Sequence, residues 1–275
     1  MAVIEKTVNK DLEKEISVDL KNFNYSAFKR IMDNYGVVIC RKALPVLELK
    51  KVRDLIFQRI FTQMRLGRDL REDLKSMTFP REYITKTMSF ILEGVSDMAE
   101  IDKDNIFRNG VENCGIIPLL EEYMKSKAQW LKPFYYSRTV DPLEEKYKLK
   151  LHQDGTFLRG WGDVEKFMIC WAPLVSIGDH IPGLQLVAKK FNTIFETATG
   201  GYHGIVMSSE EQFLQEYKDY VVRPCVNVGD FIMFSPFTPH RTYITDEMTD
   251  IRTSVDFRFY CGEFKPNPSQ AKQYS

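Results

Sequence analysis

Residues 147–157 read YKLKLHQDGTF, and this stretch carries an alternating strand pattern that ends in a polar turn with His152 and Asp154. Leu149 and Leu151 alternate with lysines, which is typical of a half-buried β-strand. The polar residues and the glycine that follow mark a turn. The sequence therefore predicts a strand end that presents an imidazole and a carboxylate one residue apart.

Short strand patterns separated by turn residues continue from about residue 130 almost to the end of the chain. The predicted strands cover 134–140, 146–152, 166–174, 183–188, 220–228, 230–235, 240–245 and 252–262. Helical spacing dominates before residue 130, apart from a short apolar strand at 35–40. Many strands after a helical region predict an α+β, mainly β fold, with a β-sandwich or barrel and N-terminal helices packed on one sheet.

The predicted helices begin with one from Pro45 to about Met64 and continue with 69–78 and 116–129. A further helix is predicted as an insertion between strands at 208–220, where Ser208 and Glu211 form a capping-box pattern. No repeat or low-complexity linker divides the chain, so we expect a single domain over 1–275.

Charge and cysteine content argue against several classes of protein. The chain has 38 basic and 38 acidic residues, so no overall field attracts nucleic acid or an anionic membrane. Its five cysteines are scattered and form no CxxC pair, which argues against a disulfide framework or a thiolate zinc site. The charged N-terminus lacks the apolar run of a secretion signal. We expect a cytoplasmic protein that acts on a small molecule, without nucleic-acid or membrane partners; the oligomeric state stays open.

Two imidazoles and one carboxylate on one face of an iron ion leave positions open for a co-substrate and O2. His152 and Asp154 supply two of these ligands. The third should come from a distant strand, and His240 in GDFIMFSPFTPHRTY, residues 229–243, follows a Gly-Asp turn and an apolar strand. His180 and His203 lie in glycine-containing loops, and we interpret them as surface residues.

A cation that holds a dicarboxylate co-substrate is predicted twelve residues after His240. Arg252 offers a planar guanidinium that can make two parallel hydrogen bonds to a carboxylate. Strand alternation places Ser254 on the same face, two residues on. Lys150 shares the face of His152 by the same alternation and is a further candidate for the co-substrate, although an exposed lysine on an edge strand is an equally simple reading.

Together, HQD, the distal His240 and RTS resemble the HxD…H…RxS signature of the non-haem Fe(II)- and 2-oxoglutarate-dependent dioxygenases. YGVVICRKAL, residues 35–44, and residues 229–243 are similar to the phytanoyl-CoA dioxygenase-like branch. The resemblance implies a double-stranded β-helix, the jelly-roll fold of that superfamily and of the cupins. It also implies Fe(II), 2-oxoglutarate and O2 as cofactor and co-substrates, and decarboxylation to succinate and CO2 coupled to hydroxylation of an unactivated carbon.

Residue roles follow from the same resemblance: His152, Asp154 and His240 would bind iron, and Arg252 and Ser254 would hold 2-oxoglutarate. Because Asp154 is a carboxylate, hydroxylation is favoured over halogenation, while desaturation, ring formation and epimerisation stay open. The segment IPGLQLVAKKF, residues 181–191, departs from the Pro-Gly-Ser-His turn of the family, so the substrate does not transfer from relatives. We expect a natural-product intermediate or an amino-acid derivative.

Aromatic and polar residues near the motif are candidates for the substrate cavity, with core packing as the alternative. These candidates are Gln153, Phe157, Trp161 and Trp171, and a hydroxyl from Tyr135, Tyr136 or Ser137. The helix at 208–220 is either a lid over the site or a surface helix.

Two other functions remain open from the sequence. A cupin-type metalloenzyme could use the same fold without 2-oxoglutarate, although it would have no use for Arg252 and Ser254. A non-catalytic jelly-roll binding module would carry a decayed metal site. In that case Asp154 would cap its own turn and Arg252 would pair with Asp256 on a solvated face.

Overall fold

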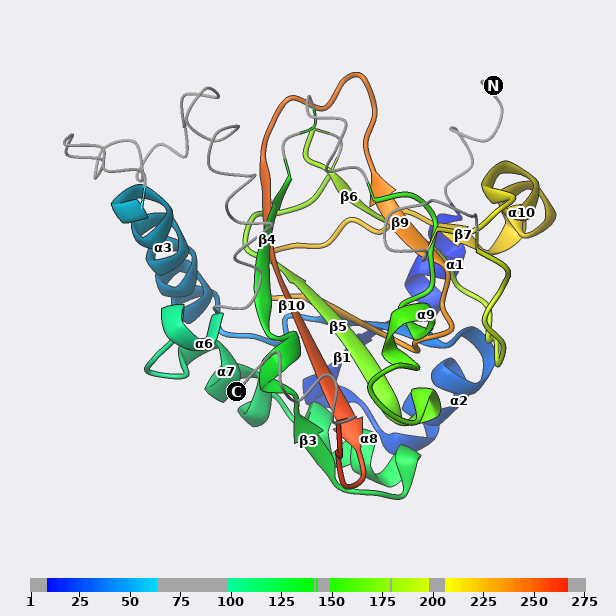
Figure 1. Ribbon diagram of the computed structural model, residues 1–275, viewed down its shortest axis with the longest axis horizontal. Helices are drawn as coiled ribbons and strands as arrows, with labels where there is room; N and C mark the ends of the chain where they lie inside the picture. The colour runs from blue at the N-terminus through cyan, green and yellow to red at the C-terminus, as the bar shows by residue number, and fades with distance from the viewer. Residues whose placement is uncertain are drawn as a thin grey trace.

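The computed structural model describes residues 9–63, 98–140, 142, 149–178, 180–197 and 206–266. Its strands form a seven-stranded sheet and a three-stranded sheet, and helices lie around the larger one (Figure 1). In the described part of the chain the strands make two sheets rather than one closed barrel. The chain is thus a mixed α/β protein with a sheet-rich core.

The helices are α1 (Lys10–Glu15), α2 (Tyr25–Tyr35), α3 (Val46–Gln63), α6 (Met98–Ile101), α7 (Ile106–Asn113), α8 (Ile116–Met124), α9 (Gly155–Leu158) and α10 (Glu210–Glu216). The strands are β1 (Ser17–Asp19), β2 (Val37–Arg41), β3 (Ala128–Trp130), β4 (Tyr136–Val140), β5 (Phe167–Pro173), β6 (Gly183–Val187), β7 (Val221–Val222), β8 (Phe231–Phe234), β9 (His240–Tyr243) and β10 (Arg252–Cys261). Short 3-10 helices lie at Leu20–Asn22, Lys132–Phe134, Val164–Lys166 and Lys218–Tyr220.

The large sheet has the order β1-β2-β8-β5-β10-β3, and β4 also pairs with β10. The long strand β10 runs antiparallel to β5 along one edge and to β3 and β4 along the other. Every residue of β5 is buried, which explains its continuous apolar run, since elements cover both of its faces. One face of β10 packs on the helices, where Phe257 lies 5.2 Å from the ring of Phe107 in α7.

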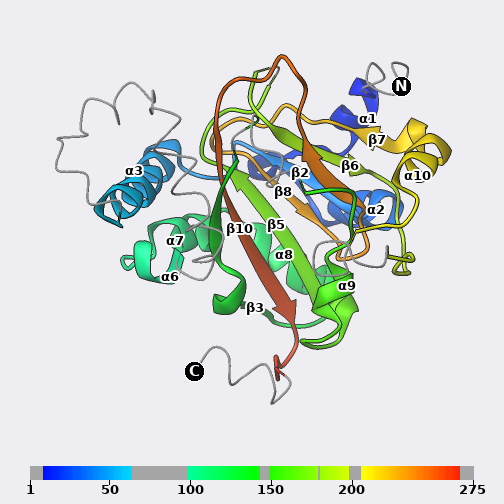
Figure 2. The same cartoon turned by 45° about the horizontal axis from the view of Figure 1, so that its top comes forward.

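The small sheet has the order β7-β6-β9 and lies across from β5 and β10. In both views α3, α6 and α7 lie on one side of the molecule, beyond β4, and α10 lies on the opposite side beside β7 (Figure 2). Phe213 and Leu214 of α10 join a separate apolar cluster with Leu151 and Val187. The inner faces of the two sheets oppose each other, and residues of both sheets line the space between them.

Most predicted strands are confirmed, because their apolar runs match buried positions. Two predictions differ from the structure: in 220–228 only Val221–Val222 form a strand, β7, and in 146–152, residues 149 and 150 have no regular secondary structure. This part still runs beside β9, since the Thr242 N–H donates to the Leu149 carbonyl at 3.0 Å. The helix predicted at 69–78 lies outside the described residues.

Two helix predictions need correction. The helix predicted at 116–129 ends at Met124, and β3 begins at Ala128. The 208–220 segment contains α10, but Ser208 does not form a capping box. Its hydroxyl donates to the Glu196 carbonyl instead, and Ser209 is the N-cap residue.

None of the five cysteines, all of which lie in the described residues, forms a disulfide, and Cys40, Cys170 and Cys261 are buried. Among the described helices, none combines the length and the apolar character needed to cross a bilayer.

A buried carboxylate ties the helical layer to the strand that enters the site. Asp102 accepts the N–H groups of Ile106 at 2.7 Å and Phe107 at 3.0 Å, which begin α7. It also accepts the hydroxyl of Tyr135 at 2.8 Å, directly before β4. Asp102 is only 1% exposed, and Phe107 and Tyr135 are also buried, so water does not readily replace Asp102 as their acceptor.

We predict that Asp102→Ala lowers the free energy of unfolding by about 2–4 kcal/mol, because it leaves several buried donors unpaired. Tyr135→Phe removes one of these bonds and should cost about 1 kcal/mol. Urea denaturation followed by circular dichroism measures both. Asp104→Ala, at an exposed position nearby, is the control; an equal loss in Asp102→Ala and this variant would contradict the role of Asp102.

Candidate metal and carboxylate site

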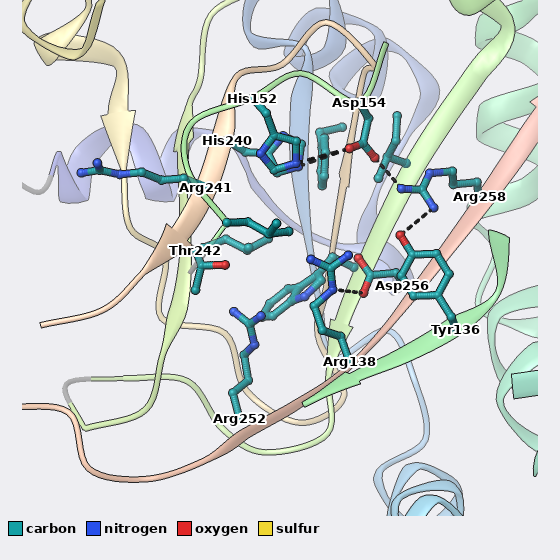
Figure 3. Close-up of a pocket in the computed structure, with 15 residues that line it drawn as sticks. Tyr136, Arg138, His152, Asp154, His240, Arg241, Thr242, Arg252, Asp256 and Arg258 are labelled. Carbon is teal, nitrogen blue, oxygen red and sulfur yellow. Dashed lines mark hydrogen bonds and ion pairs between the residues drawn. The ribbon is translucent and has the colours of Figure 1, made fainter. Parts of the chain in front are cut away.

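A pocket lies between the two sheets and collects most of the predicted polar residues (Figure 3). It is lined from the large sheet by residues of β4, β5, β8 and β10, and from the small sheet by residues of β6 and β9. His152 and Asp154 enter it from the segment before α9. Residues far apart in sequence thus meet where the inner faces of the sheets oppose each other.

His152, Asp154 and His240 form a compact buried cluster at one end of this pocket. The Asp154 Oδ1 atom lies 3.5 Å from His152 Nε2 and 3.7 Å from His240 Nε2. All three side chains are buried, and their ligand atoms lie within 4.8 Å of one another. Such separations are close to those of donors that share one ion at about 2.1 Å.

Backbone carbonyls fix how the two imidazoles point. His152 Nδ1 lies 2.7 Å from the Lys150 carbonyl, and His240 Nδ1 lies 3.0 Å from the Thr238 carbonyl. A carbonyl only accepts, so each Nδ1 carries the proton and donates it. The lone pairs are then on the Nε2 atoms, which face Asp154, and this is how proteins orient histidines that bind a metal.

The two histidines are held side by side by a reciprocal pair of backbone bonds. The His152 N–H donates to the His240 carbonyl at 3.0 Å, and the His240 N–H donates to the His152 carbonyl at 2.9 Å. The turn that follows is tight, since a Cβ on Gly155 would lie 3.0 Å from the Pro236 carbonyl oxygen. Gly155 itself donates its N–H to that carbonyl at 2.8 Å, which anchors the loop that carries Asp154.

A buried guanidinium holds the second oxygen of Asp154. Arg258 Nη2 donates to Asp154 Oδ2 at 2.6 Å, and its Nη1 donates to the Tyr136 hydroxyl at 3.1 Å. Burial alone would raise the pKa of Asp154, but Arg258 and the two imidazoles outweigh it and hold that pKa well below its usual range. Asp154 is thus an anion with one oxygen engaged and the other facing the histidines.

His240 is in the form that a metal requires. Burial and the neighbouring His152 lower the pKa of His240 to about 3, so its imidazole is neutral at physiological pH. Two imidazoles and one carboxylate are the donor set of non-haem iron sites with open positions. The residues present therefore fit an Fe(II) ion, with His152 Nε2, His240 Nε2 and Asp154 Oδ1 as its ligands.

Arg252 is a buried cation without a carboxylate partner among the described residues. It is 1% exposed, and its Nη1 donates to the Gly183 carbonyl at 3.0 Å. In the described part of the chain its Nε has no hydrogen-bond partner, and its guanidinium lies 5.4 Å from the ring centre of Trp171. Burial and nearby Arg138 lower the pKa of Arg252 to about 9, so holding this charge is unfavourable until an anion binds.

The alternation predicted for β10 brings Arg252, Asp256 and Arg258 to the pocket. Ser254 lies on the same face but does not line the pocket, and its hydroxyl donates to the Arg138 carbonyl at 3.4 Å. Arg252 does not pair with Asp256 on a solvated face, as the alternative reading expected. The role of Ser254 toward a carboxylate stays a prediction.

Lys150 does not reach the pocket. Its side chain is exposed, and Leu149 lines the pocket in its place. The strand alternation that suggested Lys150 does not apply, because residues 149 and 150 are not in a regular strand. What Lys150 contributes is its carbonyl, which accepts from His152.

Of the four substrate candidates, the structure brings only Trp171 to the pocket. The Gln153 amide braces the loops, since its Nε2 donates to the Thr193 carbonyl at 3.0 Å and its Oε1 accepts from the Phe195 N–H at 2.7 Å. Phe157 and Trp161 pack on Phe134 at 6.2 and 4.9 Å between ring centres. These three residues lie outside the pocket lining and stabilise the segments next to it.

The other candidates divide in a similar way. Tyr136 lines the pocket, whereas the Tyr135 hydroxyl is bound to Asp102 and Ser137 lies outside the pocket lining. His180 is exposed, and His203 lies outside the described residues. The pocket also contains Arg241, which forms an ion pair with Glu210 at the start of α10.

Sequence reasoning missed four charged residues of the pocket as functional candidates: Arg138, Arg241, Asp256 and Arg258. The signal for Arg138 was its alternation with Tyr136 in residues 134–140. The pairing of β4 with β10 makes this alternation meaningful, because it places Arg138 opposite Ser254 and Tyr136 opposite Asp256. That register cannot be read from one strand alone.

No protein-family model and no curated protein matches the chain, but solved structures share its fold. The carbocyclase SnoK from nogalamycin biosynthesis, a non-heme alpha ketoglutarate dependent enzyme, is 12% identical with a TM-score of 0.54, over 94% of this chain and 92% of its own. EctD from S. alaskensis, solved with 2-oxoglutarate and 5-hydroxyectoine, is 12% identical with a TM-score of 0.55, over 88% and 80%. The non-heme monooxygenase ThoJ, as a nickel complex, is 11% identical with a TM-score of 0.52, over 86% and 78%. The chain thus shares the jelly-roll fold of non-heme iron oxygenases.

We predict that Arg258→Met weakens binding of a divalent metal about 10- to 100-fold. A buried Asp154 without its cation favours the protonated form, and the proton then competes with the metal. Anaerobic titration with Fe(II) or Co(II) measures the affinity, and circular dichroism checks the fold. Tyr136→Phe, which removes one bond to Arg258, should change the affinity by less than about threefold. Equal or tighter metal binding in Arg258→Met would show that Arg258 does not maintain the ligand.

Proposed function

We propose that the protein is a non-heme Fe(II)- and 2-oxoglutarate-dependent oxygenase that acts on a small molecule. One observation carries the proposal: a buried His152–Asp154–His240 cluster shares a pocket with Arg252, a buried guanidinium that has no carboxylate partner among the described residues. A metal with open positions and a cation at a distance are what a dicarboxylate that chelates through one end requires. The shared oxygenase fold supports this reading.

The roles of the residues follow from their positions. His152, Asp154 and His240 would hold Fe(II), and Arg252 would bind the far carboxylate of 2-oxoglutarate, with Ser254 beside it. Bound iron would supply O2 activation coupled to decarboxylation of 2-oxoglutarate to succinate and CO2. The chain's own part is to orient both reactants and exclude water, which the buried walls of the pocket favour.

We infer hydroxylation as the outcome, because Asp154 occupies the ligand position that a halide would need. YGVVICRKAL and GDFIMFSPFTPHRTY support placing the chain in the phytanoyl-CoA dioxygenase-like branch. Five cysteines without a disulfide favour a reducing compartment, and we infer the cytoplasm. A natural-product intermediate or an amino-acid derivative fits as substrate.

We predict that 2-oxoglutarate added anaerobically to the Fe(II)-loaded protein produces the weak visible charge-transfer band of a chelated keto acid. His152→Ala, Asp154→Ala and His240→Ala should each abolish the band by weakening metal binding more than about 100-fold. Arg252→Ala should weaken 2-oxoglutarate about 10- to 100-fold and leave metal affinity within about threefold, because its guanidinium would bind the co-substrate and, among the described residues, makes no hydrogen bond to His152, Asp154 or His240.

Arg252→Lys keeps the positive charge but lacks the planar guanidinium. Its affinity for 2-oxoglutarate should lie between those of the wild type and Arg252→Ala, which separates the effect of charge from that of geometry. Arg108→Gln, on the exposed face of α7, is the control and should behave as the wild type. Metal binding without the band would favour a cupin-type enzyme that does not use 2-oxoglutarate. An Arg252→Ala variant that loses metal and co-substrate equally would indicate a role in folding.

A further inference from the structure

Five charged side chains from β4, β10 and the segment before α9 line the pocket: Arg138, Arg252, Arg258, Asp154 and Asp256. Arg258 and Asp154 already satisfy each other through a hydrogen bond of 2.6 Å. Arg252 is taken by the co-substrate in the proposed function. Arg138 and Asp256 therefore remain as charged groups that the proposed reaction does not use.

These two side chains form an ion pair but no hydrogen bond with each other. Arg138 Nε is 3.8 Å from Asp256 Oδ2, which is too long for a hydrogen bond. Neither of these two atoms has a hydrogen-bond partner among the described residues. Their side chains are only 21% and 13% exposed. Figure 3 shows both reaching into the pocket beside Tyr136.

The pairing of β4 with β10 sets this arrangement, because it fixes the backbone positions of both residues. A buried polar atom left without a partner costs about 1–3 kcal/mol, and an ion pair that is not hydrogen-bonded recovers little of its desolvation cost. Burial raises the pKa of Asp256 although three guanidiniums lie nearby, so its carboxylate is incompletely compensated. Among the described residues, the Arg138 Nε–H group thus lacks a hydrogen-bond acceptor, and the Asp256 Oδ2 atom lacks a donor.

We propose that Arg138 and Asp256 form a receptor for a zwitterionic head group, in which a carboxylate and an N–H-bearing ammonium lie side by side as in an α-amino acid. The inference rests on the proposed function for the reaction that follows binding. Arg138 would bind the carboxylate, and Asp256 would accept from the ammonium. The pair is neutral overall, so only a ligand group that is itself neutral leaves no buried net charge.

The same pair discriminates against simpler ligands. A group that is only anionic meets the Asp256 carboxylate, and one that is only cationic meets the Arg138 guanidinium, so each brings a like-charge contact. Tyr136 connects this receptor to the metal cluster, since its hydroxyl accepts from Arg258, which in turn binds Asp154. A bound head group would therefore lie one layer of side chains from the proposed metal.

The test uses the full-length protein loaded with Fe(II) and 2-oxoglutarate under anaerobic conditions. Each standard protein amino acid is added singly, and binding is measured by thermal shift and by perturbation of the charge-transfer band. Every amino acid that binds is then compared with its N-acetyl derivative, which lacks the ammonium, and its amide, which lacks the carboxylate. We expect at least one amino acid to bind, and each blocked derivative to bind about tenfold or more weakly.

Arg138→Met and Asp256→Asn should each lose at least about tenfold in amino-acid affinity while 2-oxoglutarate affinity stays within about threefold. Arg108→Met and Glu112→Gln, which alter an exposed arginine–carboxylate pair on α7, are the matched controls and should retain both affinities. If a pocket variant does not fold, the derivative series on the wild-type protein decides alone.

The outcomes separate this inference from the proposed function. If the band forms but no amino acid binds, or the blocked derivatives bind equally well, the receptor is wrong and the oxygenase proposal stands. If Arg138→Met weakens 2-oxoglutarate itself, Arg138 belongs with Arg252 and the receptor is likewise overturned. If the band never forms but the thermal shift requires both head groups and both residues, the receptor is supported and the proposed function fails.

Discussion

The reciprocal backbone bond between His152 and His240 is the contact on which the rest of the site depends. Each residue donates its N–H to the other's carbonyl, at 3.0 and 2.9 Å, so two distant segments of the chain are fixed in register. Because the ring nitrogens next to this pair bind the carbonyls of Lys150 and Thr238, the main chain also sets the direction of both imidazoles. Main-chain hydrogen bonds thus set the positions of the two imidazoles, which side-chain packing would otherwise have to set. Main-chain donors and acceptors of this kind are present in almost any sequence. What the sequence must supply is the small residue at Gly155, which allows Asp154 to follow closely.

The interior between the sheets is unusually polar for a protein core, and this has an energetic consequence. Arg252, Arg258 and Asp154 are all buried, and a buried charge is costly unless a partner compensates it. Arg258 and Asp154 compensate each other, whereas the buried Arg252 makes no ion pair among the described residues. Unfavourable burial of this kind persists where a ligand relieves it, so the uncompensated groups mark the binding surface better than the size of the pocket does.

The sequence allowed the polar face of β10 to be predicted, because it depends on alternation along one strand, and it allowed the grouping of His152, Asp154 and His240 to be predicted from the HxD…H pattern. Arg252, Asp256 and Arg258 alternate as expected, and all three line the pocket. It did not allow prediction of contacts that depend on strand register. Arg138 acquires meaning only because β4 pairs with β10, and Lys150 loses its expected place because the chain there is not a regular strand. Gln153 also looked functional, yet its amide bonds to the loops around residues 193–195, which no periodicity reveals.

Proteins that share this fold differ in the reactions that they catalyse. At 11–12% identity, a monooxygenase and a carbocyclase share this architecture, so the fold does not select the reaction. A metal cluster and one arginine for a carboxylate are common requirements of such chemistry and carry little information on the substrate. Under the proposed function, selectivity would therefore come from groups that neither the metal nor the co-substrate engages. In the described pocket, Arg138 and Asp256 meet that condition, and they project from two strands whose pairing fixes their separation. A rigid pair of opposite charges recognises a pattern of charges rather than a shape, which would let the rest of a substrate vary while its head group stays constant.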